Sequence, residues 1–300
     1  MKWLIIGIEG FVGSHMQTLL KSRGYDVIGT SWEKHRVNNE DTFYVDLYDT
    51  ESIKKVIIDV KPNFLVLLAG FSSMRESFLN PKGCMRVNFE STRDFLQAIQ
   101  DNNLNTKVLT ISSAMVYCSS NDILTEESPI CSNSSPYAES KYKQEQLIEE
   151  FPTINIISAR SFNHTGPNQL HSFLIPKLVN AFKVPEKEIM VEIGNTSSER
   201  DFLDVRDVCE AYRILLEEEL DHKIYNVSSS KYFSVKQILG ILEKETGKKV
   251  IIQNNPEFKS KNERPRIWGS NKLIRDETSW KPTISFEKTI KDMLYLKNEK

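Results

Sequence analysis

Tyr137 and Lys141, in the stretch SPYAESKYK, have the residue types and the spacing of a proton-transferring pair. A phenol with a pKa of about 10 is a weak catalyst at neutral pH, and a nearby lysine cation favours its phenolate form. Residues four apart lie on one face of a helix, so both side chains can point at one substrate. The pair therefore suits an enzyme that transfers hydride to or from a carbonyl or alcohol and must move a proton at the oxygen.

The spacing alone decides nothing, because KYFSVK places Tyr232 and Lys236 the same distance apart. With 10 tyrosines and 39 lysines and arginines in 300 residues, chance gives roughly one such pair. What distinguishes Tyr137 is the preceding run KVLTISS, which predicts a strand ending in Ser113. A hydroxyl there can hold a substrate oxygen. We therefore predict that Ser113, Tyr137 and Lys141 are catalytic and that the second pair is a surface or packing feature.

Short apolar runs alternate with longer amphipathic runs over the first 160 residues. KWLIIG, NFLVLLAG and KVLTISS lack polar alternation, as strands covered on both faces must. The order of elements predicts an α/β fold with a doubly wound parallel sheet of the Rossmann type. RSFNHTGPNQLHSF reads as a loop system, and a smaller C-terminal lobe should follow. We expect a dinucleotide-binding domain over 1–162 and about 203–230, and the lobe over 163–202 and 231–300.

The glycine loop GIEGFVG lies at the first predicted strand-to-helix turn. Glycines there permit a tight turn and let backbone N–H groups approach a pyrophosphate. The loop predicts a dinucleotide cofactor bound by Gly7, Gly10 and Gly13, with Phe11 and Val12 between them.

The end of the second strand indicates which dinucleotide binds. An acid there would bond the ribose 2′-OH of NAD, but this chain has Ser31, followed by Lys34, His35 and Arg36. We predict NADP(H), with contacts from Ser31 and Arg36, and NAD(H) as the alternative if these cations are only solvated. Asp46, after the third strand, could accept from the adenine amino group or cap the next turn.

Composition argues against several other classes. A net charge of −2 with interspersed signs gives no electrostatic reason to bind nucleic acid or anionic membrane. No stretch approaches the roughly 18 apolar residues of a membrane span, and the start lacks the features of a signal peptide. The four cysteines are far apart without a CxxC pair, which argues against a zinc site or a disulfide scaffold. We predict no metal and a reducing cytoplasm.

With GIEGFVG, ISSAMVY, YAESK and Asn88 in RVNFEST, the chain resembles the extended short-chain dehydrogenase/reductases that act on nucleotide sugars. The resemblance runs nearly end to end, because RSFNHTGP, ERDFLDVRD, IYNVSS and ERPRIWGSNKL also match. It is most similar to the GDP-4-keto-6-deoxy-mannose reductases and their relatives, the GDP-mannose 4,6-dehydratases.

The resemblance implies that Tyr137 donates the proton, Lys141 binds the nicotinamide ribose and lowers the tyrosine pKa, and Ser113 bonds the sugar carbonyl. Arginine forks suit diphosphate oxygens, although a surface salt bridge is the alternative for each arginine. The residues implied to hold the ribose and diphosphate of the sugar nucleotide are Asn163, Arg200 and Arg264. Further cofactor contacts are expected at Leu47, Leu68, Ala69 and Asn88, and further substrate contacts at Ser72, Ser73, Ala114 and Met115.

Met115 departs from the dehydratases, which carry an acid two residues after the strand-end hydroxyl. A thioether does no acid–base chemistry, so 4,6-dehydration is not expected. We predict NADPH-dependent reduction of the 4-keto group of a nucleotide-linked 4-keto-6-deoxy sugar, in deoxysugar or cell-surface polysaccharide biosynthesis. GDP-linked sugars are favoured over UDP- or dTDP-linked ones.

Two alternative functions and a homodimeric assembly are also considered. A 4-epimerase would use tightly held NAD, and a regulator on the same fold would bind NADP without catalysis. The resemblance also implies a homodimer through the helices that contain Phe95 and Tyr142. Those helices could equally bury their apolar faces within one chain.

Overall fold

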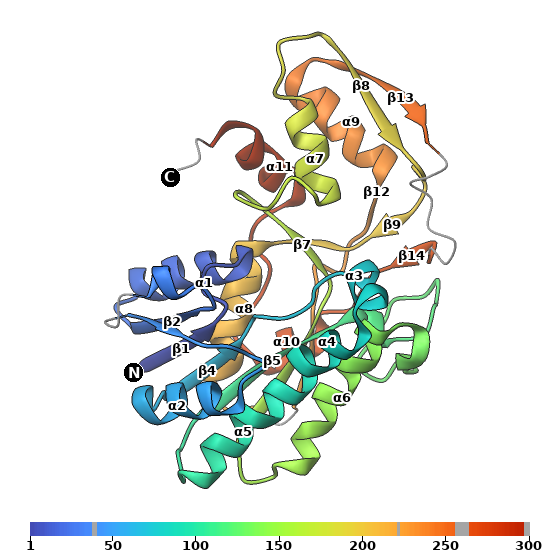
Figure 1. The fold of residues 1–300 in the computed structure, drawn as a ribbon. Helices are drawn as coiled ribbons and strands as arrows, with labels where there is room; N and C mark the ends of the chain where they lie inside the picture. The colour runs from blue at the N-terminus through green and yellow to red at the C-terminus, as the bar shows by residue number, and fades with distance from the viewer. Residues whose placement is uncertain (38–40, 221–222, 256–263, 297–300) are drawn as a thin grey trace.

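The computed structural model describes residues 1–37, 41–220, 223–255 and 264–296 (Figure 1). Its centre is a seven-stranded sheet in the order β11-β6-β5-β4-β1-β2-β3, with every neighbouring pair parallel. The predicted doubly wound α/β fold is confirmed. The strands are β1 (Lys2–Ile6), β2 (Asp26–Ser31), β3 (Thr42–Tyr44), β4 (Phe64–Leu67), β5 (Lys107–Ser113), β6 (Ile156–Ser161) and β11 (Ile224–Val227).

Helices cover both faces of this sheet (Figure 1). Neighbouring side chains of a central strand therefore enter opposite apolar layers: in β1, Ile5 joins one layer and Leu4 the other. This double coverage is why the central strands show no polar alternation. The first layer is closed by α1 (Phe11–Ser22) and α8 (Val205–Glu217), and the second by α2 (Thr50–Val60), α5 (Ser91–Asp101) and α6 (Pro136–Glu150).

Local capping fixes the start of α6, which carries Tyr137. The hydroxyl of Ser135 accepts a hydrogen bond from the backbone N–H of Ala138 at 3.1 Å. Pro136 occupies the first helical position, where its missing N–H is not needed. Tyr137 therefore lies in the first turn of α6, beside the carboxyl end of β5.

A smaller lobe lies above the sheet in Figure 1. In β8, Ile189, Val191 and Ile193 are buried and the residues between them are exposed, the period-two pattern of a sheet covered on one face. The lobe has its own apolar core. Its elements are α7 (Leu174–Ala181), β8 (Glu188–Ile193), α9 (Val235–Thr246), β13 (Lys249–Asn254) and α11 (Phe286–Tyr295).

Short strands join the sheet to the lobe. The stretch RSFNHTGPNQLHSF, expected to be irregular, contains β7 (Asn163–Thr165), which pairs in parallel with β10 (Phe202–Asp204). Three residues are too few to give a sequence pattern. Next to them lies a second small sheet of β12 (Phe233–Ser234), β9 (Glu199–Arg200) and β14 (Arg266–Ile267).

The tail of the chain does not stay in the lobe. Ile274, in α10 (Lys272–Glu277), and Trp280 lie in the apolar core of the sheet. The indole N–H of Trp280 also donates to the carbonyl of Asp207 in α8 at 2.9 Å. We therefore propose that the segment around α10 belongs to the sheet domain, in place of the expected assignment of all of 231–300 to the lobe. The other expected boundaries are kept as a proposal.

Cys118 and Cys131 form a disulfide. The cysteine pattern argues against a disulfide scaffold and favours a reducing environment, in which such a bond is rare. Their separation of 13 residues carries no signal, but an antiparallel bridge between Tyr117 and Ile130 brings the two cysteines side by side. The other cysteines, Cys84 and Cys209, are free and buried.

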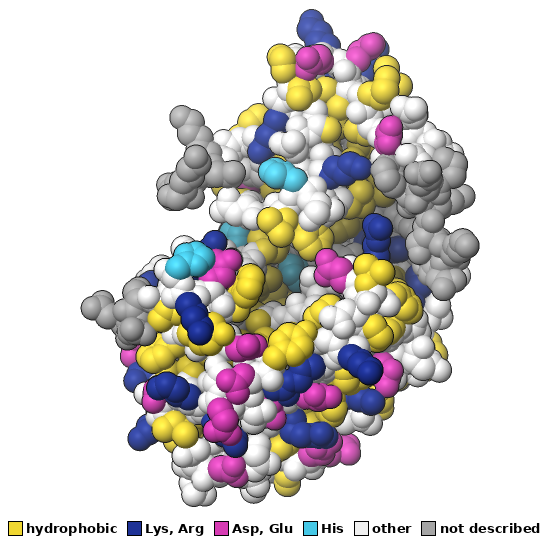
Figure 2. Space-filling model, viewed as in Figure 1, with side chains coloured by type: hydrophobic (Ala, Val, Ile, Leu, Met, Phe, Trp, Pro, Cys, Tyr) yellow, Lys and Arg dark blue, Asp and Glu magenta, His cyan; other side chains and the backbone are white. Residues whose placement is uncertain are grey.

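Figure 2 shows basic and acidic side chains interspersed over the face in view. Across the described ranges, no helix is both long and apolar enough to cross a membrane. Nor do three or more His, Cys, Asp or Glu residues of those ranges gather as a metal ion would require.

Candidate active site

A cavity of about 1110 Å³ runs along the carboxyl ends of the sheet strands and under the lobe. Figure 2 shows the surface hollowed between the two parts of the molecule. In doubly wound sheets the ligand crevice lies outside these strand ends. The volume exceeds the roughly 300–1,000 Å³ of a site for one small ligand, so two ligands fit side by side.

Most of the predicted site residues line this cavity. They come from the glycine loop, the ends of β2 to β6 and the lobe. The lining residues are Gly7, Gly10, Phe11, Val12, Gly13, Arg36, Asp46, Leu47, Leu68, Ala69, Ser72, Ser113, Met115, Tyr137, Lys141, Asn163 and Arg200.

Five predicted residues lie outside the lining: Ser31, Ser73, Asn88, Ala114 and Arg264. Ser73 caps the short helix that follows it, accepting from the N–H of Glu76 at 3.3 Å. Ala114 is buried in a turn after β5. The roles of all five as ligand contacts stay predictions.

Asn88 supports the site from beneath. Its carboxamide oxygen accepts from the backbone N–H of Phe71 at 2.8 Å, and its nitrogen donates to the hydroxyl of Ser140 at 3.0 Å. Asn88 therefore ties the loop after β4 to α6. Its side chain is 1% exposed, so a positioning role fits this geometry better than direct contact.

The glycine loop has the geometry of an anion cradle. Gly7 has φ +91°, and a Cβ on Gly13 would lie 2.2 Å from the carbonyl oxygen of Gly7. Helix α1 begins with no capping side chain and no acid in its first turn. Its first N–H groups therefore point at the cavity without a side-chain partner, which fits a pyrophosphate.

The three predicted catalytic residues all line the cavity. The hydroxyl of Ser113 hydrogen-bonds the phenol of Tyr137 and accepts from the N–H of Met115 at 3.2 Å. Burial raises the pKa of Tyr137, and the bond to Ser113 partly opposes that rise. The phenol is therefore protonated at neutral pH and able to donate.

Lys141 lies one turn further along α6 and is 6% exposed. Burial lowers the pKa of Lys141 to about 8. Tyr232, by contrast, packs edge-on against Trp268 with ring centroids 5.1 Å apart and lies outside the cavity lining.

Replacing Lys141 with methionine should stabilise the fold at pH 7. The folded pKa of about 8 lies below the ordinary 10.5. Below pH 8 the folded chain therefore carries the full cost of a buried cation, and the cost fades as the pH rises to 10.5. We expect Lys141→Met to raise the free energy of unfolding by about 3 kcal/mol at pH 7 and much less at pH 10. Urea denaturation at both pH values measures it.

The control is Lys55→Met, because the Lys55 side chain is 76% exposed and pairs with Asp59 on the surface of α2. That variant should show no pH-dependent gain. A Lys141→Met variant no more stable than the parent at pH 7 would contradict the inferred cost of the buried cation.

A buried ion pair holds α6 against the sheet. Arg160, in β6, donates from Nε and Nη2 to the two carboxylate oxygens of Glu145 at 2.8 and 2.7 Å. The hydroxyl of Ser112, next to Ser113, donates to the same carboxylate at 2.5 Å. Glu145 lies two helical turns after Tyr137 on the same helix, so the network links the elements that carry the predicted catalytic tyrosine and serine. Sequence patterns gave no sign of it.

The two arginines predicted to bind the sugar nucleotide differ in position: Arg200 lines the cavity and Arg264 does not. The guanidinium of Arg200 donates to the carbonyl of Glu199 at 2.8 Å. Arg264 lies behind Met115 and donates to its carbonyl at 3.4 Å. Within the described ranges Nη1 of Arg264 is buried without a hydrogen-bond partner, and burial lowers the pKa of Arg264. Arg264 as a whole is half-buried, and a guanidinium with a spare donor suits an anionic ligand.

Among the cavity residues that sequence reasoning missed, His164 and Glu9 are polar groups that a ligand could contact. His164 hydrogen-bonds the carbonyl of Phe162 through Nδ1 at 3.1 Å and stacks on Phe11. Burial lowers the pKa of His164, so the ring is neutral and its Nε2 is an acceptor. Glu9 lies inside the glycine loop and also lines the cavity. Their places in NHTGP and GIEGFVG were the available signals.

The model of the GDP-mannose 4,6 dehydratase family matches residues 4–293. The chain belongs to this family. One relative of this family member is the GDP-6-deoxy-D-mannose reductase of Pseudomonas aeruginosa, with 28% identity over 97% of this chain and 95% of the relative. Another is the GDP-6-deoxy-D-talose 4-dehydrogenase of Aggregatibacter actinomycetemcomitans, with 30% identity over 91% and 90%. The solved structure of RMD from P. aeruginosa complexed with NADPH has a TM-score of 0.84, with 26% identity over 98% and 96%.

These similarities confirm the predicted relationship to the extended short-chain dehydrogenase/reductases. They also confirm that this member of the GDP-mannose 4,6 dehydratase family is an oxidoreductase that acts on nucleotide sugars. They do not reach the individual residues, whose roles rest on the geometry above.

Proposed function

We propose that this chain reduces the 4-keto group of a GDP-linked 4-keto-6-deoxy sugar to a hydroxyl, in the synthesis of deoxysugars. Bound NAD(P)H would supply the hydride. The names of two relatives, a GDP-6-deoxy-mannose reductase and a GDP-6-deoxy-talose 4-dehydrogenase, support a GDP-sugar with chemistry at C4. The relative solved with NADPH supports a nicotinamide dinucleotide, NADP(H) or NAD(H), as the cofactor.

The distribution of acidic residues around the cavity favours reduction over dehydration. Among the described residues that line it, the carboxylates are Glu9, Glu33 and Asp46. All three follow β1, β2 or β3, on the side of the sheet away from β5. Beside Ser113 the lining residue is Met115, which cannot move protons at C5 and C6 of a sugar. This supports a reductase within a family named for a dehydratase.

The proposed residue roles follow from the geometry. The Ser113 hydroxyl, already bonded to Tyr137, would hold the keto oxygen in place. Tyr137 would donate its proton to that oxygen as it becomes a hydroxyl, and the Lys141 cation would stabilise the resulting phenolate. Asn163, Arg200 and Arg264 are proposed to hold the ribose and diphosphate.

The test uses purified protein, GDP-4-keto-6-deoxy-mannose and NADPH or NADH, followed by absorbance at the reduced nicotinamide band and by NMR of the product. Consumption of reduced cofactor with formation of a 4-hydroxy-6-deoxy sugar is expected, with UDP- and dTDP-linked analogues reacting more slowly. Conversion of GDP-mannose to a 4-keto sugar would instead indicate a dehydratase. Interconversion of two stable sugar nucleotides on bound NAD would indicate an epimerase.

A homodimer and a cytoplasmic location complete the proposal. Phe95 is 1% exposed and packs on its own sheet, so a dimer would use the outward faces of α5 and α6, the helix that carries Tyr142. Because disulfides are rare in the cytoplasm, the redox state of Cys118 and Cys131 in the cell decides the proposed location. Sedimentation of the purified protein tests the homodimer. Thiol labelling in freshly lysed cells tests whether the two cysteines are reduced, as a cytoplasmic location predicts.

A further inference from the structure

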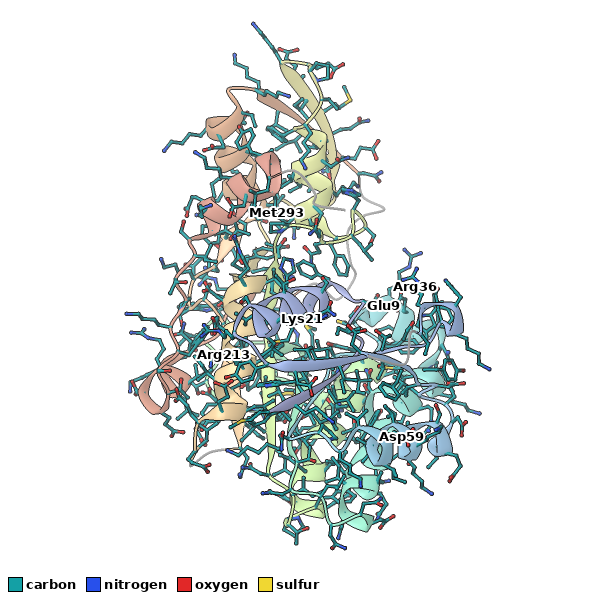
Figure 3. All side chains as sticks on the ribbon, turned by 90° about the vertical axis from the view of Figure 1, so that its left-hand side faces the viewer. Glu9, Lys21, Arg36, Asp59, Arg213 and Met293 are labelled. Atoms are coloured by element: carbon teal, nitrogen blue, oxygen red, sulfur yellow. A yellow bond between two sulfur atoms is a disulfide. The ribbon has the colours of Figure 1, made fainter. Side chains whose placement is uncertain are left out.

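The cations predicted to bind a 2′-phosphate already have partners within the chain. Arg36 pairs through Nη1 with Glu9 at 3.3 Å and through Nε with Glu33 at 2.5 Å (Figure 3 shows Glu9 and Arg36 together at one edge of the sheet domain). His35 lies 3.5 Å from the same Glu33 carboxylate. Lys34 lies over the ring of Tyr44, 5.0 Å from its centroid.

The hydroxyl at the end of β2 is also engaged. Ser31 donates to Glu9 at 2.7 Å and accepts from the backbone N–H of Glu33 at 3.1 Å. It is 2% exposed. A phosphate oxygen would therefore have to displace Glu9 to obtain a hydrogen bond from Ser31.

The register of the sheet explains why Glu9 reaches this place. Ile6 of β1 lies opposite Thr30 of β2, so the residues that follow the two strands come together at one edge. The glycine loop thereby delivers a carboxylate to the point where related folds use an acid at the end of β2 to accept from the ribose 2′-OH.

The local charge favours a hydroxyl over a phosphate. Glu9 and Glu33 both line the cavity, and together they outnumber the guanidinium of Arg36 that lies between them. A 2′-phosphate would bring further negative charge close to these carboxylates, whereas a 2′-hydroxyl could donate a hydrogen bond to one of them.

We propose that Glu9 is a specificity-determining residue that admits NAD(H) by opposing the 2′-phosphate of NADP(H). The inference rests on the proposed function only in requiring that the glycine loop binds a dinucleotide. Glu9 acts in two ways: its carboxylate faces the 2′ position, and it neutralises Arg36.

Calorimetric titration of the oxidised dinucleotides tests the proposal without any sugar. We expect the parent to bind NAD⁺ at least as tightly as NADP⁺. In Glu9→Gln, which keeps the shape and the acceptor for Ser31, the ratio of the two dissociation constants should shift about tenfold or more toward NADP⁺ at low salt. The control Glu51→Gln, whose 80% exposed carboxylate lies on α2, should leave the ratio unchanged.

Arg36→Ala separates the two effects. In the parent background it should change NADP⁺ affinity little, because Arg36 is already paired, and in the Glu9→Gln background it should weaken NADP⁺ several-fold. A ratio within twofold of the parent in Glu9→Gln would overturn the proposal. If neither dinucleotide binds, the proposed function fails as well, whereas binding without turnover of any 4-keto sugar leaves the assignment of Glu9 standing.

Discussion

Replacing Tyr137 with phenylalanine is expected to lower kcat for 4-keto reduction by about 10²–10⁴-fold. The change removes only the phenol oxygen, which hydrogen-bonds Ser113, and leaves the ring in the first turn of α6. Without that oxygen the keto group would lose its proposed proton donor. Consumption of reduced cofactor with the 4-keto sugar measures the loss, and circular dichroism shows whether the fold is kept.

The matched control is Tyr232→Phe. Tyr232 has the same spacing to a following lysine, but its ring packs against Trp268 and beneath the guanidinium of Arg266. That variant should retain the activity of the parent. If Tyr137→Phe kept more than half of the parent kcat, Tyr137 would not be the proton donor.

Replacing Glu145 with alanine is expected to lower the free energy of unfolding by about 3–5 kcal/mol. The variant would leave the guanidinium of Arg160, 5% exposed as a residue, in the interior without its bidentate partner. Urea denaturation at pH 7 measures the loss. Should the variant not fold, Glu145→Gln provides the measurement, because an amide keeps one acceptor and should lose less.

An exposed ion pair supplies the comparison for that experiment. Asp59 pairs with Lys55 at 2.9 Å on the surface of α2, and Figure 3 labels it on the outer side of the molecule. Asp59→Ala should cost no more than about 1 kcal/mol. Equal losses for Glu145→Ala and Asp59→Ala would mean that the buried network does not hold α6 in place.

Sequence reasoning reached the sheet and the centre of the site because both depend on local order. Apolar runs such as NFLVLLAG indicate buried strands. Ser113 ends a strand and Tyr137 begins the next long helix, so the βα order of the chain already places both at the carboxyl edge of the sheet. The glycine loop was found for the same reason.

What sequence reasoning missed depends on pairing across long separations. Glu9 and Ser31 are 22 residues apart and meet only because β1 and β2 pair in a fixed register. Cys118 and Cys131 meet through a bridge between their neighbours. Neither contact leaves a periodic pattern, so composition and spacing alone could not reveal it.

The chain returns to the sheet twice after the lobe begins, first at α8 and β11 and again at Trp280. This determines which fragments of the protein could fold alone. Leu215 of α8, Tyr225 of β11 and Trp280 all belong to the core beside β1. A fragment ending at residue 162 would expose that core and leave β6 as an open edge. The sheet domain is therefore completed by segments from the end of the chain, and a cut at residue 162 would not release it as a separable module.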